Sequence, residues 1–180
     1  MRKLIVNTLV TLDGVYGDPR SWAGPYFDEE AAESSLALLR DSDAMVMGRV
    51  TYEYFAETWP ADTGPYADRV NGIRKYVFSS TLTAVEWTNS TLVSDDPVGS
   101  VARLKSEGDG YLVMYGFGQL ARTLLAHDLV DEVGFWVFPL LIGDGVPLFR
   151  LAPATHLRLR SAQARSSGVV SLSYARADPA

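Results

Sequence analysis

The chain has 180 residues, of which 47% are hydrophobic and 21% are charged, and this composition is typical of one globular domain, which we expect to span residues 1–180. Its net charge of −6, without a cluster of Lys and Arg, argues against nucleic-acid binding, while the absence of cysteine and the wide separation of its two histidines, His127 and His156, argue against a metal site. No apolar run approaches the roughly 20 residues that span a bilayer, and the N-terminus lacks the longer apolar region of a secretory signal, so we expect a cytoplasmic protein that does not contact membranes.

The first half of the sequence alternates short apolar runs with helical patterns. Leu4–Val10 is predicted to be a buried strand, and a loop rich in Gly, Pro and Asp follows over Asp13–Tyr26. A helix is predicted over Asp28–Leu39, with Asp28 as its N-cap. Next we expect a strand over Ala44–Met47 that stops at Gly48, a helix over Thr51–Ala56, and a polar loop through Pro60, Gly64 and Pro65.

The second half continues this alternation and then changes. We expect strands over Lys75–Ser79, around Leu92-Val93, and over Tyr111–Tyr115 and Val133–Phe138, with helices over Pro97–Ser106 and Gln119–Ala126. A turn is expected at Gly143-Asp144-Gly145. The last two predicted strands, Leu157–Ala164 and Val169–Ala175, flank Ser166-Ser167-Gly168 and indicate a hairpin. Strand–helix alternation followed by a hairpin predicts a mixed sheet covered by helices.

The segment Met47-Gly48-Arg49-Val50-Thr51-Tyr52 joins a predicted buried strand to a predicted helix. Glycine lets a ligand approach the backbone closely, and the start of a helix offers unpaired N–H groups to a phosphate. Arg49 suits the same ligand because a guanidinium can donate two parallel hydrogen bonds. The alternative, which this segment alone leaves open, is a turn glycine followed by a solvated arginine.

Two further segments have a related pattern. Tyr115-Gly116-Phe117-Gly118-Gln119-Leu120 again joins a strand, a glycine turn and a helix, although it lacks the third glycine of the full Rossmann pattern. Ser79-Ser80-Thr81 follows another strand, and its hydroxyls either bind phosphate or cap a turn. Because α/β proteins bind ligands at the carboxyl ends of their strands, we expect the three segments to converge at one edge of the sheet.

In this order, Met-Gly-Arg-x-Thr-Tyr, Ser-Ser and Gly-x-Gly-x-Leu resemble the cofactor signature of dihydrofolate reductases. Thr11-Leu12-Asp13-Gly14 and the late segment Pro139–Phe149 resemble the reductase domain of bifunctional riboflavin-biosynthesis deaminase–reductases. The resemblance covers nearly the whole chain. It implies a dihydrofolate-reductase-like α/β fold of three layers: a mixed, mostly parallel sheet with a C-terminal antiparallel hairpin and helices on both faces.

The same resemblance implies an NADPH cofactor and assigns residues to it. Gly48, Arg49 and Thr51 correspond to binders of the adenosine 2′-phosphate and the pyrophosphate. Ser79 and Ser80 are implied as further contacts on the adenosine-phosphate side. The loop that contacts the pyrophosphate and the nicotinamide ribose is implied to consist of Gly116, Phe117, Gly118, Gln119 and Leu120.

The substrate side is less well defined. The first strand, with Asn7, and the Asp13-Gly14 segment are expected to border the substrate and the nicotinamide. Trp22 and Phe27 form either a lid that stacks on a planar heterocycle or a small satellite hydrophobic cluster.

Catalytic residues are expected from carboxylates near this region. Dihydrofolate reductases place a carboxylate on the first helix, but the corresponding position here is Ala32, with Glu33 beside it. Asp13, Glu33 or a bound water are therefore the candidate proton donors, and Asp13 equally fits a turn before Gly14.

We therefore expect an NADPH-dependent reductase that transfers hydride to a small planar heterocycle and resembles 5-amino-6-(5-phosphoribosylamino)uracil reductase of riboflavin biosynthesis. The alternatives are a dihydrofolate or pterin reductase, and a non-catalytic nucleotide-binding protein of the same fold. The riboflavin-type reductases pair through their sheets, and Val133–Ile142 offers more apolar surface than one small core needs, so a homodimer is also expected.

Overall fold

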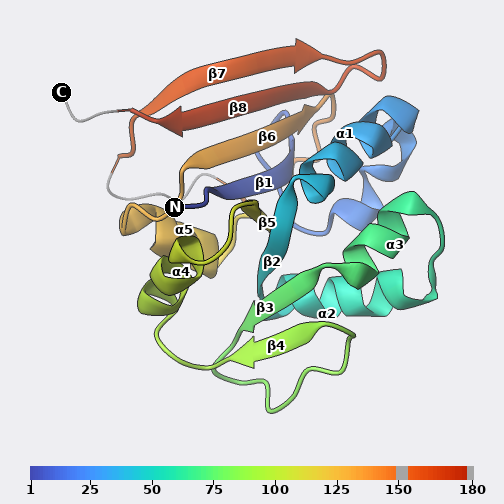
Figure 1. Cartoon of the computed structure of the whole chain (residues 1–180). Helices are drawn as coiled ribbons and strands as arrows, with labels where there is room; N and C mark the ends of the chain where they lie inside the picture. Colours follow the sequence, from blue (N-terminus) through green and yellow to red (C-terminus); the bar gives the residue numbers. More distant parts are fainter. Residues whose placement is uncertain (149–153, 178–180) are drawn as a thin grey trace.

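Eight strands form one sheet at the centre of the computed structural model, which describes residues 1–148 and 154–177 (Figure 1). Their order across the sheet is β4-β3-β2-β5-β1-β6-β8-β7. Strands β1 to β6 are parallel to their neighbours among themselves, whereas β8 is antiparallel to β6 and β7. The mixed, mostly parallel sheet and the C-terminal hairpin are thus confirmed. The strands are β1 (Leu4–Thr11), β2 (Ser42–Gly48), β3 (Arg74–Phe78), β4 (Ser90–Val93), β5 (Tyr111–Tyr115), β6 (Glu132–Phe138), β7 (Leu157–Ala164) and β8 (Val170–Arg176).

Within these residues, helices cover both faces of the sheet and complete the three layers (Figure 1). On one face pack α1 (Glu29–Arg40), α2 (Arg49–Thr58) and α3 (Pro65–Gly72), and on the other pack α4 (Pro97–Ser106) and α5 (Gln119–Ala126). Short 3-10 helices are η1 (Pro19–Ser21), η2 (Gly24–Tyr26) and η3 (Trp59–Ala61). None of the helices in the described ranges is long and apolar enough to cross a membrane.

Successive side chains of the central strands point to opposite faces, so each strand contributes to two cores. Val46 of β2 is buried with Val101 of α4 and Leu124 of α5. Its neighbour Met47 is buried on the other face with Phe55 of α2. Because both faces of these strands are covered, their sequences are near-continuous apolar runs.

Two helices begin differently from the prediction. The pattern predicts a polar loop through Gly64 and Pro65, but α3 begins there, with Pro65 in its first turn. A proline at that position loses no helical hydrogen bond, because the first N–H groups of a helix have no partner within it. α2 begins at Arg49 rather than Thr51, directly after Gly48, which has no side chain to mark the start. Phe149, the last residue of the late glycine-containing segment, lies outside the described residues.

Candidate functional site

The carboxyl ends of β2 and β5 are neighbours in the middle of the sheet, because the two strands pair in parallel. α2 follows β2 and packs on one face, whereas α5 follows β5 and packs on the other (Figure 1). Neighbouring strand ends are thus followed by helices on opposite faces. This arrangement is the topological switch point at which open α/β sheets bind their ligands.

Both helices that start at the switch point lack side-chain caps. Their N-cap residues are Gly48 for α2 and Gly118 for α5. α1 and α4 instead begin at Asp28 and Asp96, whose carboxylates accept N–H groups of the first turn. α2 and α5 therefore keep their first N–H donors and the positive ends of their dipoles for a ligand, and an anion such as a pyrophosphate fits them.

The loop after β5 is held against the start of α2. Gly116 has a φ of 82°, in the left-handed region that favours glycine. The hydroxyl of Thr51 donates to the carbonyl oxygen of Tyr115 at 3.3 Å. A Cβ at Gly48 would lie 3.9 Å from the Cβ of Leu120, so the two segments are close neighbours. The structure therefore brings four of the predicted cofactor residues into one place.

Arg49 and the Ser79-Ser80 pair flank this place. The Arg49 side chain is 47% exposed, and its guanidinium pairs with Glu53 one turn further along α2 at 3.0 Å. Such exposed i, i+4 pairs contribute only about 0.3–0.5 kcal/mol, so a phosphate can displace Glu53 at little cost. Ser79 follows β3, and its Oγ accepts the N–H groups two and three residues further on, which makes it a turn cap. Ser80 is exposed.

The two side chains of the glycine loop after β5 point to different environments. Phe117 is 2% exposed, and its ring packs against Phe135 in the core, with 6.0 Å between ring centroids. Gln119, the first residue of α5, is exposed. Phe117 can therefore offer a nucleotide only its backbone, whereas Gln119 can offer its side chain.

Asp13 anchors the late glycine-containing loop. Its Oδ2 accepts the N–H groups of Ile142 and Gly143 at 3.0 and 2.7 Å, and its Oδ1 accepts the hydroxyl proton of Thr11. Gly14 follows with a φ of 86°, as the turn requires. The hydrogen bond from Thr11, together with those from Gly143 and Ile142, lowers the pKa of Asp13. Since such a carboxyl group holds its proton poorly, the contacts favour the turn-forming alternative over a proton donor.

The two aromatic residues expected in a lid differ from each other. Trp22 is 6% exposed, its Nε1 donates to the carbonyl oxygen of Gly17, and its ring meets Phe138 edge-on. Phe27 is 42% exposed and stacks on Trp136. The structure thus supports the satellite-cluster alternative for Trp22 and leaves Phe27 as the ring that a planar ligand can reach.

Glu33 and Asn7 also lie in different environments. Glu33 is exposed on α1, whose buried residues are Ala31, Ser35 and Leu39. Within α1, which the structure describes in full, no carboxylate lies on the buried face. Asn7 of β1 is only 9% exposed. Of these two candidates, Asn7 is therefore the one whose polar side chain is nearly buried at the sheet.

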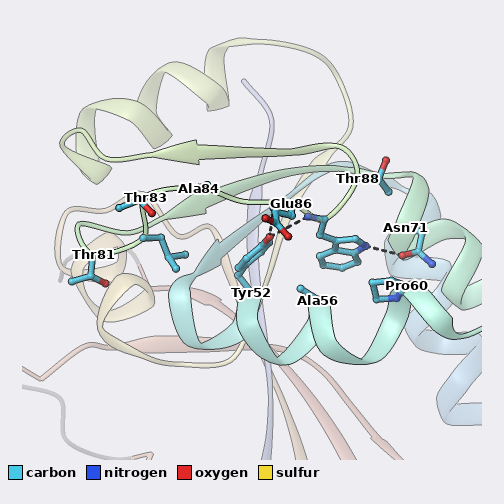
Figure 2. A pocket seen from close by; sticks show the side chains of 11 residues that line it. Tyr52, Ala56, Pro60, Asn71, Thr81, Thr83, Ala84, Glu86 and Thr88 are labelled. Carbon is cyan, nitrogen blue, oxygen red and sulfur yellow. Dashed lines mark hydrogen bonds between the residues drawn. The ribbon is translucent and has the colours of Figure 1, made fainter.

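A separate hollow of about 900 Å³ lies between α2 and the β3–β4 connection (Figure 2). Tyr52 of α2 crosses it, and its hydroxyl accepts the N–H groups of Glu86 and Trp87. Glu86 is the one charged residue among the described residues of the lining, so the hollow does not suit phosphate groups. Sequence reasoning missed it because Tyr52 and Trp87 have the sequence signature of ordinary core residues.

The arrangement of strand ends and helix starts agrees with a known family. The profile of the RibD C-terminal domain family matches residues 2–171. The chain belongs to this family. As a RibD C-terminal domain it is similar to YwjB of Bacillus subtilis, at 28% identity over 98% of this chain and 99% of that protein.

Solved structures agree with the family. A putative riboflavin biosynthesis protein from Shewanella sp. PV-4 has a TM-score of 0.80 at 25% identity, and the match covers 98% of this chain and 99% of that one. Dihydrofolate reductase from Enterococcus faecalis, solved with NADP(H), has a TM-score of 0.66 at 14% identity, with 98% and 97% covered. The second similarity shows the fold alone, and it confirms that this RibD C-terminal domain has the dihydrofolate-reductase-like fold.

Proposed function

We propose that this RibD C-terminal domain is an NADPH-dependent oxidoreductase that reduces a small planar heterocycle. The observation that carries the proposal is the pair of uncapped helix starts at the switch point, with Arg49 as the first residue of α2. Two sets of N–H donors suit the pyrophosphate of a dinucleotide. A guanidinium suits the 2′-phosphate that distinguishes NADPH from NADH.

NADPH, when bound, supplies hydride from its nicotinamide ring to an electron-poor carbon. The chain contributes position. Gly116 and the start of α5 hold the phosphate and ribose end, while β1 and Phe27 border the ring end. The product also needs one proton. Because Asp13 holds its proton poorly and Glu33 lies on the exposed side of α1, the geometry favours delivery by water.

Family membership favours a riboflavin-type substrate related to 5-amino-6-(5-phosphoribosylamino)uracil. Dihydrofolate is less favoured, because α1 buries Ala31, Ser35 and Leu39 rather than a carboxylate. A carboxylate there would be needed to hold the positive charge of a protonated pterin ring.

NADPH titration and absorbance assays with a ribosylaminouracil, whose ribosylamine can open to a reducible C=N bond, with dihydropterin and with dihydrofolate test the proposal. We expect NADPH to bind and to be oxidised with a uracil-type substrate. Binding without oxidation by any of these compounds would support the non-catalytic alternative. Failure to bind NADPH would contradict the proposal altogether.

We also propose a homodimer, formed through the β7–β8 hairpin. Strand register places Leu159 beside Tyr174 and Leu172 beside Phe135. These four side chains lie on the same face of the sheet as α4 and α5, which cover that face over the central strands. Leu159 is 52% exposed, and the hairpin lies at the sheet edge away from those helices (Figure 1). A second copy can cover this apolar face by two-fold symmetry. Light scattering should give twice 19.7 kDa, and Leu172→Asp should give the monomer mass; a wild-type mass of 19.7 kDa would rule the dimer out.

A further inference from the structure

The hollow between α2 and the β3–β4 connection is separate from the proposed cofactor site (Figure 2). None of its lining residues in the described part of the chain is among those proposed to bind NADPH. They come from α2, η3, α3 and the connection. The volume of about 900 Å³ is within the range of about 300–1,000 Å³ that is usual for small-molecule pockets, so the hollow has room for a ligand of its own.

Two buried aromatic side chains line the hollow. Tyr52 is 7% exposed and Trp87 is 6% exposed. Ala56 and Pro60 add apolar surface on the side of α2 and η3, and Leu82 adds it on the side of the connection. Apolar area gains free energy when a ligand removes it from water, and aromatic pairs gain more from their preferred geometry. This part of the hollow therefore suits an aromatic body.

Contacts from three elements hold Trp87 in place. Its backbone N–H donates to the hydroxyl oxygen of Tyr52 in α2 at 3.2 Å, and its Nε1 donates to the Oδ1 of Asn71 in α3 at 2.8 Å. The ammonium group of Lys75 in β3 lies 4.2 Å from the ring centroid, and three carbonyl oxygens that accept from it compensate its charge. The aromatic wall is therefore formed before a ligand arrives, and binding does not have to order it.

The exposed part of the lining is polar and carries one negative charge. Thr81, Thr83 and Thr88 are exposed and offer hydroxyl groups. Glu86 is exposed as well, and it is the one charged residue among the described lining residues. Its backbone N–H donates to the hydroxyl oxygen of Tyr52 at 2.9 Å, so the residue with the carboxylate is fixed beside the aromatic wall. An apolar interior with a carboxylate at its opening matches a ligand with an apolar body and a positive end.

We propose that this hollow binds a small arylalkylamine, with its aromatic body against Tyr52 and Trp87 and its ammonium group at the carboxylate of Glu86. A neutral compound of the same shape lacks the ion pair, and an anion is repelled by the carboxylate. The proposal stands apart from the reductase function, because the hollow shares no described lining residue with the cofactor site.

Three indole probes of similar shape test the charge and the aromatic body separately. Tryptamine has an ammonium group on its side chain, tryptophol has a hydroxyl group and indole-3-acetate has a carboxylate. In NMR titrations at neutral pH and low ionic strength, tryptamine should shift the amide signals of Glu86 and Trp87. It should bind about fivefold more tightly than tryptophol and about tenfold or more above indole-3-acetate. Added salt should reduce these differences, because the carboxylate is exposed.

Three variants connect binding to the hollow. Glu86→Gln should bind tryptamine and tryptophol with equal affinity, because no carboxylate remains in the lining. Glu107→Gln is the matched control: it removes an exposed carboxylate that follows α4, outside the lining, and it should bind all probes as wild type does. Ala56→Leu puts a larger side chain into the apolar wall and should weaken all three probes. Urea unfolding of each variant checks that the fold is kept.

Three results would overturn the proposal: no shift of the Glu86 and Trp87 signals with millimolar tryptamine, equal affinities of wild type for the three probes, or an unchanged preference for tryptamine in Glu86→Gln. Each of them leaves NADPH binding untouched, and the cofactor titrations test that function separately.

Discussion

Four of the α-helices fall into two pairs that differ in their N-cap residue. α1 and α4 begin with an aspartate that accepts N–H groups of the first turn, as Asp96 does from Val98 and Gly99. α2 and α5 begin with Gly48 and Gly118, which have no side chain to accept the same groups. The first arrangement stabilises a helix by itself, whereas the second reserves the helix start for an anion. The contrast separates the helix starts that the chain itself stabilises from the two that we propose to bind the cofactor.

Replacing a glycine N-cap with an aspartate N-cap should have the largest effect on cofactor affinity. Gly118→Asp gives α5 the cap that α4 has, in an extended N-cap conformation and with no atom within 4 Å of the new Cβ. We expect stability to rise by a few tenths of a kcal/mol, while NADPH affinity falls by about a hundredfold because a carboxylate meets the pyrophosphate. Fluorescence titration and urea unfolding measure the two effects. Gly118→Asn, a neutral cap that accepts the same N–H groups, should lose less affinity than Gly118→Asp, and equal losses in both variants would refute the charge argument.

Removing the cation at the start of α2 should have the next largest effect. Arg49→Ala should cost about 1.5–3 kcal/mol in NADPH binding, or roughly tenfold to a hundredfold, and leave NADH binding nearly unchanged. Titration of both cofactors decides this. Glu53→Gln is the control, since it removes the ion-pair partner and keeps the guanidinium. Equal loss of both cofactors would remove Arg49 from the 2′-phosphate role.

Removing a structural cap should act only on stability. Asp96→Ala should lower the free energy of unfolding by about 1 kcal/mol, because two N–H groups of α4 lose their acceptor. NADPH affinity should not change. Urea unfolding and the same fluorescence titration measure both quantities. A loss of NADPH affinity in this variant would contradict the assignment of a purely structural role to the aspartate cap of α4.

The smallest expected effect concerns a carboxylate that caps a loop instead of a helix. Hydrogen bonds from Thr11, Gly143 and Ile142 lower the pKa of Asp13 below its ordinary value of 3.8. Its contribution to the folded loop is thus fully present above pH 3.8 and is lost as the pH falls through the lower, folded pKa. The amide proton shifts of Ile142 and Gly143 should titrate with a midpoint below 3.8 and become pH-independent in Asp13→Asn. A midpoint above 3.8 would contradict the anchor.

The capping contrast also explains how far sequence reasoning reached. The start of α1 after Asp28 and the start of α4 at Pro97 were predictable, because an aspartate marks each of them. α3 was missed and α2 was placed two residues late, because Gly64 and Gly48 give the same signal as a loop. α5 was still predictable from the spacing of its apolar residues. The strands and the final hairpin followed from their apolar runs.

The local roles of site residues were less predictable, since they depend on contacts between distant segments. The burial of Trp22 against Phe138 and the anchoring of Gly143 by Asp13 join residues more than a hundred positions apart. The Asn7 Oδ1 lies so close to β6 that a Cβ at Gly134 would be 2.7 Å from it, and the one local signal of this is a glycine inside an apolar strand, which marks close approach but not what approaches.

The central position of β1 has a consequence for synthesis on the ribosome. β1 is synthesised before the other seven strands of the sheet, yet both of its partners, β5 and β6, begin only at Tyr111 and Glu132. At roughly 5–20 residues per second, this apolar strand waits for several seconds without its partners. During that time β2 and β3 can pair with each other, but the sheet cannot close around β1. The proposed cofactor loop, in which the N–H of Gly116 donates to the carbonyl oxygen of Asn7, is therefore completed among the last parts of the fold.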